Sequence, residues 1–408
     1  MKKGYLSQYF DGVAIKILSA VEADILTSNQ HEFNGVKSLV NILGIPTGKA
    51  KYPAQFIYLT DYETDPIVED GFLTWYDARE RHVTRTEFRL YFPTNRVVQY
   101  ANAGDILIIA RKKDGNLLAI VAENGTTIAS QIIWLFGITD IDHPGFSIRE
   151  ELETEQDRIE FASRVILENI GITVETTEDT FLDDMLSNFG LEFPTTKVFS
   201  DYSRTTIPDI RPLENSDIAL LAYMEREEIL FKTLEKHIIA ERLSAGFDDD
   251  VDSFISFSLS VQNRRKSRAG LALENHLEFI FNDLSIKYSR TAVTENKSKP
   301  DFLFPGKKEY HDESFNPLNL TMLGVKSSCK DRWRQVLAEA ERIDKKHLLT
   351  LEAAISTNQT DEMKFKELQL VVPKKIHESY TKDQQKWLLD LETFIDIVKT
   401  RQKNAGIE

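Results

Sequence analysis

The pattern of apolar residues in the sequence changes near the middle of the chain. This change predicts a fold with two parts that differ in secondary structure. From about residue 5 to residue 138, short β-type runs such as FIYLTDY, TEFRLYF and ILIIARKKDGNLLAIV alternate with turn signals. Many short strands at this spacing are typical of a barrel or a sandwich. Within ILIIARKKDGNLLAIV, the pair Asp114-Gly115 predicts a hairpin with a tight primed turn.

A polar stretch, residues 172–217, follows the β-rich half. It is rich in Thr and Asp, holds three prolines and predicts a domain boundary. Just before it, residues 149–170 predict a helix with an apolar stripe of Ile159, Phe161, Val165, Ile166 and Ile170. Beyond it, the pattern becomes α/β. Helices are expected near residues 217–244, 249–262, 270–284, 330–343 and 384–401, and strands near 301–304, 320–327, 347–352 and 368–372.

Composition excludes some classes of protein. No apolar run reaches the roughly 18 residues of a membrane span. The N-terminal segment MKKGYLSQYFDG lacks the long apolar core of a secretory signal, so a cytoplasmic location is expected. The one cysteine, Cys329, rules out an internal disulfide framework and a cysteine-built zinc site.

The net charge of −15 is unevenly distributed along the chain. Residues 151–250 carry 24 acidic and 9 basic side chains, so this stretch alone accounts for the whole acidic excess. Residues 251–350 carry 17 basic and 13 acidic side chains and are locally basic. A polyanionic partner such as DNA is therefore not excluded, because its phosphates need basic residues only on the surface that binds them.

Three residues in the basic stretch have the types and spacing of a site that hydrolyses phosphodiesters. Asp301 opens a short apolar strand in KPDFLFP, and Lys326 lies in the expected strand LTMLGVKSS. Glu339 lies 13 residues after the lysine, on the helix expected in KDRWRQVLAEAERI. In such sites carboxylates hold Mg²⁺, the metal lowers the pKa of a bound water, and a lysine offsets phosphate charge. The pattern is the PD-(D/E)xK nuclease motif with one departure, because Gly324 stands where an acid is usual.

Two neighbouring segments extend this site. The amphipathic helix LALENHLEFIFNDL places Glu274 as a further acid beside it. The segment NRRKSRAG is either an ordinary surface loop or helix start, or a DNA-binding patch. Its basic residues are Arg264, Arg265, Lys266 and Arg268.

The runs VQNRRKSRAGLALENHLEFIF, KPDFLFPGKKEYHD and LGVKSSCKDRWRQVLAEAERI together resemble the catalytic domain of EcoRII-type (type IIE) restriction endonucleases. The resemblance extends from about Phe193 to the C-terminus. It implies that Asp301, Lys326 and Glu339 are the catalytic residues. It also implies that Asp301 and Glu339 hold Mg²⁺ and that Glu274 is an accessory catalytic acid. The family uses this displaced acid, so the glycine in the motif is expected.

The same resemblance implies how DNA is recognised. Lys330, Asp331 and Arg332 match the family residues that contact G·C pairs, and Arg334 is a further expected DNA contact. The chemistry agrees, because Arg and Lys donate to guanine O6/N7 and a carboxylate accepts from cytosine N4. The family's sites have an outer CC/GG core around one central pair, with cleavage before the first C.

The N-terminal half resembles the effector DNA-binding domains of several restriction enzymes, which have a pseudobarrel fold. Basic and aromatic residues alternate in its segment GFLTWYDARERHVTRTEFRLYFPTN. They are Arg79, Arg81, Arg85 and Arg89 among Trp75, Tyr76 and Phe88. This segment is either a set of exposed charges on β-strands or a surface that grips a DNA groove.

These observations predict a mixed α+β or α/β chain with three parts. Residues 1–172 form a β-rich pseudobarrel effector domain that binds DNA, 173–190 a hinge, and 191–408 an α/β domain with the restriction-endonuclease-like (PD-(D/E)xK) fold. The expected activity is Mg²⁺-dependent, type II hydrolysis of double-stranded DNA at a short (pseudo)palindromic site containing CC/GG, leaving 5′-phosphates. The alternatives are a DNA-binding regulator with an inactive nuclease domain, and a repair nuclease that recognises DNA structure.

The expected partners follow from this function. A palindromic duplex presents two equivalent strands, so a homodimer through the catalytic domain is expected. The family resemblance implies binding of at least two copies of the DNA site, a cognate DNA methyltransferase in the same restriction-modification system, and autoinhibition by the effector domain. The acidic stretch 151–250 is expected to contribute to autoinhibition by lying against the basic stretch 251–350. No membrane partner is expected.

Overall fold

The computed structural model describes residues 3–23, 31–34, 36–62, 66–138, 140–141, 144–174, 180–329 and 332–407. The chain divides into two compact units. Unit 1 comprises Met1–Thr173 and Ala354–Thr360, and unit 2 comprises Val174–Ala353 and Asp361–Glu408. The division falls at the start of the expected hinge, residues 173–190. Part of that hinge is helical, because it includes α7 (Leu182–Phe189).

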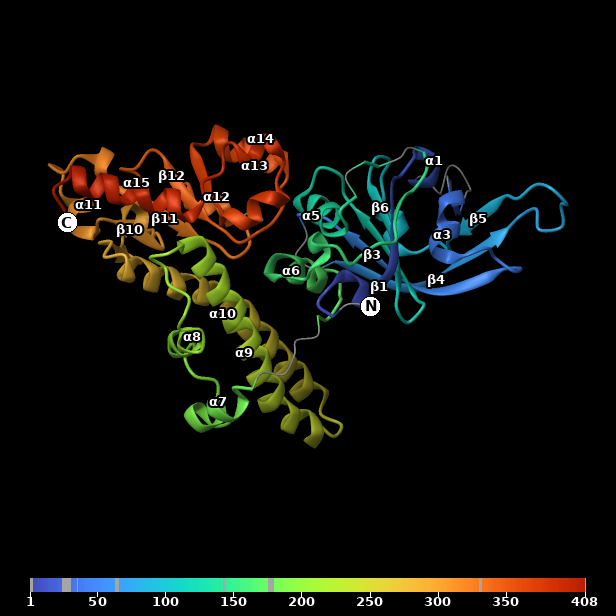
Figure 1. Ribbon diagram of the computed structural model, residues 1–408, viewed down its shortest axis with the longest axis horizontal. Coiled ribbons are helices and arrows are strands. Elements are labelled where there is room, and N and C mark those ends of the chain that lie inside the picture. Colours follow the sequence, from blue (N-terminus) through green and yellow to red (C-terminus); the bar gives the residue numbers. More distant parts are fainter. Residues whose placement is uncertain are drawn as a thin grey trace. The chain divides into compact units, whose positions relative to one another are not determined.

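Unit 1 is built on a curled eight-stranded sheet with the strand order β2-β5-β4-β3-β7-β6-β1-β8 (Figure 1). All neighbouring strands are antiparallel except β3 and β7, which are parallel. The strands are β1 (Phe10–Ile17), β2 (Glu32–Phe33), β3 (Ala50–Leu59), β4 (Ile67–Asp77), β5 (Phe88–Tyr91), β6 (Ile106–Lys112), β7 (Leu117–Ala122) and β8 (Ser147–Arg149). The helices are α1 (Ala20–Ala23), α3 (Val40–Leu43), α4 (Arg96–Tyr100), α5 (Thr127–Phe136) and α6 (Phe161–Asn169).

The β6–β7 hairpin is present, but its turn differs from the predicted primed type. Gly115 has a φ of 84°, whereas Asp114 does not have the positive φ that a type I′ turn requires. Lys112 N donates to Asn116 O at 2.9 Å, and Gly115 N donates to Lys112 O at 3.0 Å. These bonds describe a three-residue loop with glycine in the left-handed position, the next most common hairpin connection.

The helix expected over residues 149–170 is shorter than predicted. Residues up to Arg149 belong to strand β8, and α6 begins only at Phe161 after a capping box between Glu160 and Ser163. Of the expected stripe, Ile166 and Ile170 are buried, but Val165 is 43% exposed. The acid-rich run before Glu160 therefore carries only a single 3-10 turn, Glu155–Asp157, and the cap sets where α6 begins.

A buried ion pair holds the edge of unit 1. Lys16 on β1 and Glu22 on α1 are both almost fully buried, and Lys16 Nζ lies 2.6 Å from Glu22 Oε1. Glu22 also accepts hydrogen bonds from the backbone N–H groups of Ser19 and Asn34. The carboxylate therefore joins α1, β1 and the residues after β2, and the ammonium balances its charge.

We expect Lys16→Met to lower the free energy of unfolding by about 3–5 kcal/mol, because it leaves a buried carboxylate without a counter-ion. Lys16→Met combined with Glu22→Gln is expected to recover part of this loss, since the amide oxygen still accepts backbone hydrogen bonds. The matched control is Lys113→Met, whose ion pair with Asp11 has the same 2.6 Å length but is solvent-exposed. It is expected to cost below about 1 kcal/mol. Urea unfolding of the full chain measures all three, and equal losses for Lys16→Met and Lys113→Met would contradict this assignment.

Unit 2 combines helices with a five-stranded sheet in the order β13-β12-β11-β10-β9. Strand β11 is antiparallel to β10 and parallel to β12, which in turn is parallel to β13. The strands are β9 (Ser289–Arg290), β10 (Phe302–Phe304), β11 (Thr321–Val325), β12 (Lys346–Leu349) and β13 (Leu368–Val371). The helices are α7, α8 (Thr196–Thr205), α9 (Ser216–Ala245), α10 (Val251–Asp283), α11 (Lys307–His311), α12 (Trp333–Val336), α13 (Thr357–Phe365), α14 (Lys382–Gln385) and α15 (Leu391–Asn404).

Helices α9 and α10 lie side by side as a long pair (Figure 1). The two helices expected at 249–262 and 270–284 are one continuous helix, because the intervening arginines are paired with acids of α9. Arg265 lies 2.6 Å from Glu235, and buried Arg268 contacts Glu227 and Glu228. The acidic and basic stretches of the sequence thus meet inside unit 2, as neighbouring helices. No described helix combines the length and the apolar character that crossing a membrane requires.

Candidate active site

Strand pairing brings Asp301 and Lys326 together. Asp301 directly precedes β10 and Lys326 directly follows β11, and these strands are antiparallel, so the start of one lies beside the end of the other. Asp301 Oδ2 accepts a hydrogen bond from Lys326 Nζ at 2.9 Å and from Val325 N at 2.6 Å. Both side chains are mostly buried, at 15% and 12% exposed. The aspartate is therefore held by the backbone as well as by the lysine.

The absence of an acid at Gly324 has a steric cause. A Cβ atom on Gly324 would lie 2.8 Å from Val336 Cγ2, because α12 packs directly against β11 at this point. A contact below 3.0 Å forces a shift of backbone or side chain. An aspartate or glutamate at this position would therefore require the Val336 side chain or α12 itself to move, which favours a second carboxylate from elsewhere in the chain.

Glu339 lies on a tight turn, and the expectation of a helix over 330–343 is wrong in this respect. Helix α12 ends at Val336, and the next three backbone N–H groups donate to carbonyls three residues back. Ala340 then adopts a positive φ of 50°, which ends the helical path. The tighter turn therefore sets the position of the glutamate.

A buried lysine that sequence reasoning missed supports this turn. Lys346 on β12 is 9% exposed, and its Nζ donates to Ile343 O at 2.9 Å and to Ala340 O at 3.5 Å. From the other side, Ala340 N donates to Thr294 Oγ1 at 3.4 Å. In the sequence, Lys346 is only a lysine at the start of an apolar strand. Such lysines commonly lie on the surface, so nothing in the sequence indicated that this one is buried. Its partners are backbone carbonyls, and only the fold reveals them.

The carboxyl group of Glu339 is electrostatically unusual. Its Oε2 atom is buried and has no hydrogen-bond partner among the described residues. Burial and the nearby charge of Asp301 raise the pKa of Glu339 to about 7, although the charges of Lys326 and Lys346 oppose this rise. An acid with this pKa binds a proton near neutral pH and is able to exchange it for another cation.

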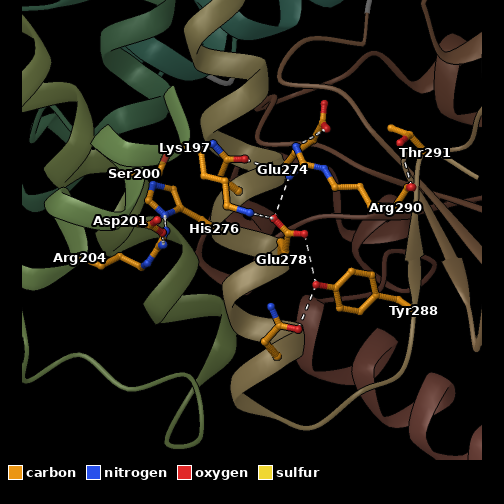
Figure 2. Close-up of polar contacts among 12 residues, drawn as sticks. Lys197, Ser200, Asp201, Arg204, Glu274, His276, Glu278, Tyr288, Arg290 and Thr291 are labelled. Atoms are coloured by element: carbon orange, nitrogen blue, oxygen red, sulfur yellow. Dashed lines mark hydrogen bonds and ion pairs between the residues drawn. The ribbon is translucent and has the colours of Figure 1, made fainter. Parts of the chain in front are cut away.

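Glu274 reaches the same neighbourhood from α10. Burial raises the pKa of Glu274, a hydrogen bond from Arg290 opposes this, and the charges of Asp301 and Lys326 also act on it. Arg290 Nη2 donates to Glu274 Oε2 at 2.8 Å. Figure 2 shows Arg290 extending from β9 toward α10. Sequence analysis missed this arginine, because its segment KYSRTAV contains no motif.

The carboxylates fit a hard divalent cation. Mg²⁺ prefers oxygen ligands and is usually held by one or two carboxylates, with water and substrate phosphate completing its coordination. The structure offers Asp301 together with the unpartnered oxygen of Glu339. A group of three or more His, Cys, Asp or Glu side chains that would enclose a metal ion does not occur in the described part of the chain. The donor set therefore suits a metal that keeps several of its own ligands.

The predicted DNA contacts differ in how accessible they are. Lys330 and Asp331 lie outside the described residues. Arg332, Lys266, Arg81 and Arg85 are exposed and form no ion pair within the described ranges. Five others are paired with carboxylates: Arg79 and Arg89 with Glu87, Arg265 with Glu235, Arg268 with Glu227 and Glu228, and Arg334 with Glu362. Arg264 lies over the ring of Phe193. The DNA contact expected for Arg268 stays a prediction, and the burial of this side chain disfavours such a contact.

In unit 1, one of the aromatic residues expected on a DNA-binding surface belongs to the core. Trp75 is fully buried, its Nε1 donates to Gly44 O at 2.9 Å, and its ring stacks on Phe88. The alternation of β4 turns this tryptophan inward. The hydroxyl group of Tyr76 instead donates to Glu32 at 2.6 Å. Burial is the larger cause, and this hydrogen bond the second cause, of the rise in the pKa of Tyr76 to about 12.

We expect Glu339→Gln to stabilise the metal-free protein above pH 7. Because folding raises the pKa of Glu339 from 4.5 to about 7, the folded state binds more protons than the unfolded state between these values. The free energy of unfolding therefore falls as the pH rises through this window, by about 1–3 kcal/mol. Glutamine removes this loss, so the variant should match the wild type at pH 5 and exceed it at pH 8. Urea unfolding at both pH values measures this, and an equal difference at the two would contradict it.

Comparison with known proteins places this site in context. A family model described as "EcoRII C terminal" matches residues 231–395. The type II restriction enzyme EcoRII of Escherichia coli is 31% identical over 334 residues, which are 79% of this chain and 77% of the relative.

Two solved structures are also similar. "Metal-depleted Ecl18kI in complex with uncleaved, modified DNA" has a TM-score of 0.45 and 18% identity, covering 56% of this chain and 86% of that one. "Restriction endonuclease PspGI-substrate DNA complex" has a TM-score of 0.44 and 17% identity, covering 52% and 94%. The family assignment depends on the sequence matches alone. By its identity to EcoRII over more than three quarters of both chains, this protein belongs to the EcoRII family of type II restriction enzymes.

Proposed function

We propose that this chain is a Mg²⁺-dependent, site-specific endonuclease that hydrolyses double-stranded DNA at a short (pseudo)palindromic site with a CC/GG core and leaves 5′-phosphates. The observation that carries the proposal is the Asp301–Lys326 contact at 2.9 Å beside the unpartnered carboxylate oxygen of Glu339. Membership of the EcoRII family supports the same activity. An inactive regulator is less favoured, because it would have no need of this costly cluster of buried acids.

Each residue of the cluster has a distinct proposed role. Asp301 and Glu339 would hold Mg²⁺, which when bound lowers the pKa of a water and stabilises charge on the phosphate. Lys326, already beside Asp301, would orient the attacking water and offset the charge of the scissile phosphate. Glu274 is the accessory acid, and its mostly buried position limits the water around it.

DNA recognition is proposed for the segment that follows the lysine. Exposed Arg332 would donate to a guanine of the CC/GG core, with Lys330 donating to a second guanine and Asp331 accepting from cytosine N4. Exposed Lys266 would contact a phosphate, as would Arg264, which lies over the ring of Phe193, and Arg334, which pairs with Glu362. Arg265 is a weaker candidate, because a phosphate contact would leave its buried partner Glu235 without a counter-ion. A two-fold homodimer through unit 2 matches the symmetry of such a site.

Unit 1 is the proposed effector domain. Arg81 and Arg85 are exposed between β4 and β5, while Arg79 and Arg89 share Glu87. We propose that the first two contact DNA phosphates and that the paired arginines shape the loop. Binding of one DNA copy here would relieve autoinhibition of the nuclease. Part of the acidic stretch lies against the basic stretch, because acids of α9 pair with arginines of α10 inside unit 2. Its contribution to autoinhibition stays a prediction. A cognate methyltransferase would protect host DNA at the same site.

Digestion of phage DNA tests the proposed activity. The purified full chain with Mg²⁺ is expected to give discrete fragments, and sequencing of their ends should reveal a CC/GG site with 5′-phosphates. Asp301→Asn should reduce cleavage by at least about 10³-fold, because it removes a metal ligand and the lysine's partner. Binding of the same DNA without metal should change by less than about 3-fold. Random ends would instead support a structure-directed nuclease, and wild-type binding without cleavage would support a regulator.

Autoinhibition predicts a dependence on the number of sites. A plasmid with one site is expected to be cut slowly and a plasmid with two sites roughly 10-fold faster, because tethering raises the effective concentration of the second copy. A short duplex carrying the site, added in trans, should accelerate the one-site plasmid, and a scrambled duplex is the control. Arg81→Gln with Arg85→Gln should weaken this stimulation more than it weakens cutting of the two-site plasmid. Equal rates on both plasmids, with no effect of the duplex, would argue against autoinhibition.

A further inference from the structure

The accessory acid Glu274 accepts a hydrogen bond from Arg290, and the same arginine also contacts other residues of α10. Arg290 Nη2 donates to Glu274 Oε2 at 2.8 Å, while Nη1 donates to Glu278 Oε2 and to Asn275 Oδ1, both at 3.0 Å. All three partners lie on one stretch of α10, and Glu274 and Glu278 are one helical turn apart. The planar guanidinium therefore contacts two carboxylates and an amide on one helix face (Figure 2).

The partners of Arg290 are themselves fixed by their neighbours. Glu278 contacts Lys197 Nζ at 3.5 Å and accepts a hydrogen bond from Tyr288 at 3.4 Å. Asn275 Nδ2 donates to Ser200 Oγ at 3.2 Å. These contacts come from α8 and from the segment before β9, so the arginine has little freedom to turn away from Glu274 (Figure 2).

The backbone of Arg290 is tied to the strand that carries the catalytic aspartate. Arg290 pairs with Phe302 across the β9–β10 ladder, and Thr291 N donates to Asp301 O at 3.1 Å. The residue therefore links α10, which carries Glu274, to the strand pair that places Asp301. Its side chain is 21% exposed and that of Glu274 is 17% exposed, so both are shielded from solvent.

We propose that Arg290 is a positioning residue for the nuclease reaction: it orients Glu274 toward Asp301 and Lys326 and fixes the distance between α10 and β10. This inference rests on the proposed function of the same site. The arginine holds the acid and is not proposed to contact the phosphate, because three of its N–H groups already donate to Glu274, Asn275 and Glu278.

A double-mutant cycle on the full-length protein tests this role. Arg290→Gln is expected to lower the single-turnover cleavage rate at saturating DNA roughly 10–100-fold, the usual effect of removing a residue that orients an active-site ligand. In a Glu274→Gln background the same change should cost less than about 3-fold, because there is no carboxylate left to orient. Arg290→Lys keeps the positive charge but lacks the forked N–H donors of the guanidinium group. Its cleavage rate should therefore lie between those of the wild type and Arg290→Gln.

Two measurements separate positioning from other roles. Affinity for specific DNA without divalent metal, measured by fluorescence anisotropy, should change by less than about 2-fold in Arg290→Gln. The matched structural control is Arg401→Gln, which removes an arginine that donates to Leu320 O and Thr321 Oγ1 at the start of β11. It is expected to lower thermal stability but to leave the cleavage rate within about 3-fold of the wild type.

Several results would overturn the inference. They are a wild-type rate in Arg290→Gln, an equal loss in the Glu274→Gln background, a parallel loss of DNA affinity, and a wild-type rate in Glu274→Gln itself. If Arg290→Gln does not fold, Arg290→Lys in the two backgrounds decides by the same criteria. Absence of cleavage by the wild-type protein would be a different result, since it would remove the proposed function together with this inference.

Discussion

The ion pair between Asp301 and Lys326 is the contact around which the acids of the candidate site in unit 2 are arranged, because it allows several acids to share one small, mostly buried space. Two like charges about 4 Å apart repel by about 4 kcal/mol at an effective dielectric constant of 20. Each acid here has a nearby cation: Asp301 has Lys326, Glu274 has Arg290, and Glu339 lies near Lys326 and Lys346. These cations do not fully compensate the charge of Glu339, because burial, followed by the charge of Asp301, still raises its pKa to about 7.

The sequence predicted those parts of the site in which a strand pattern and a chemically characteristic residue occur in the same segment. Strand alternation and the Pro-Asp pair located β10 and β11, and the family motifs identified the residues that the structure places together. Glu339 was expected on a helix, but hydrogen bonds to carbonyls three residues back and the positive φ of Ala340 place it on a turn. Arg290 and Lys346 were missed because their partners lie on other elements, so their environment depends on tertiary packing.

The distribution of charge along the sequence separated an acidic stretch from a basic one, but it did not show which of their residues pair with each other. The acidic stretch 151–250 was expected to lie against the basic stretch 251–350 and so to contribute to autoinhibition. In the structure, acids of α9 balance Arg265 and Arg268 on α10, and the run NRRKSRAG is the middle of a helix. Arginines with buried partners are poor candidates for DNA phosphates, since losing the ion pair leaves a buried acid uncompensated. Sequence alone does not separate them from exposed neighbours such as Lys266.

The packing of α12 on Gly324 also affects which changes in chain length the fold tolerates. Because Val336 lies against the strand, the segment from Trp333 to Glu339 consists of the short helix α12 and the tight turn that follows it. An insertion or deletion there would carry the Glu339 carboxylate away from Asp301. The mostly exposed residues between α11 and β11 have no such restriction. Length variation among relatives that keep this site is therefore expected before β11, whereas the segment from Trp333 to Glu339 should stay constant in length.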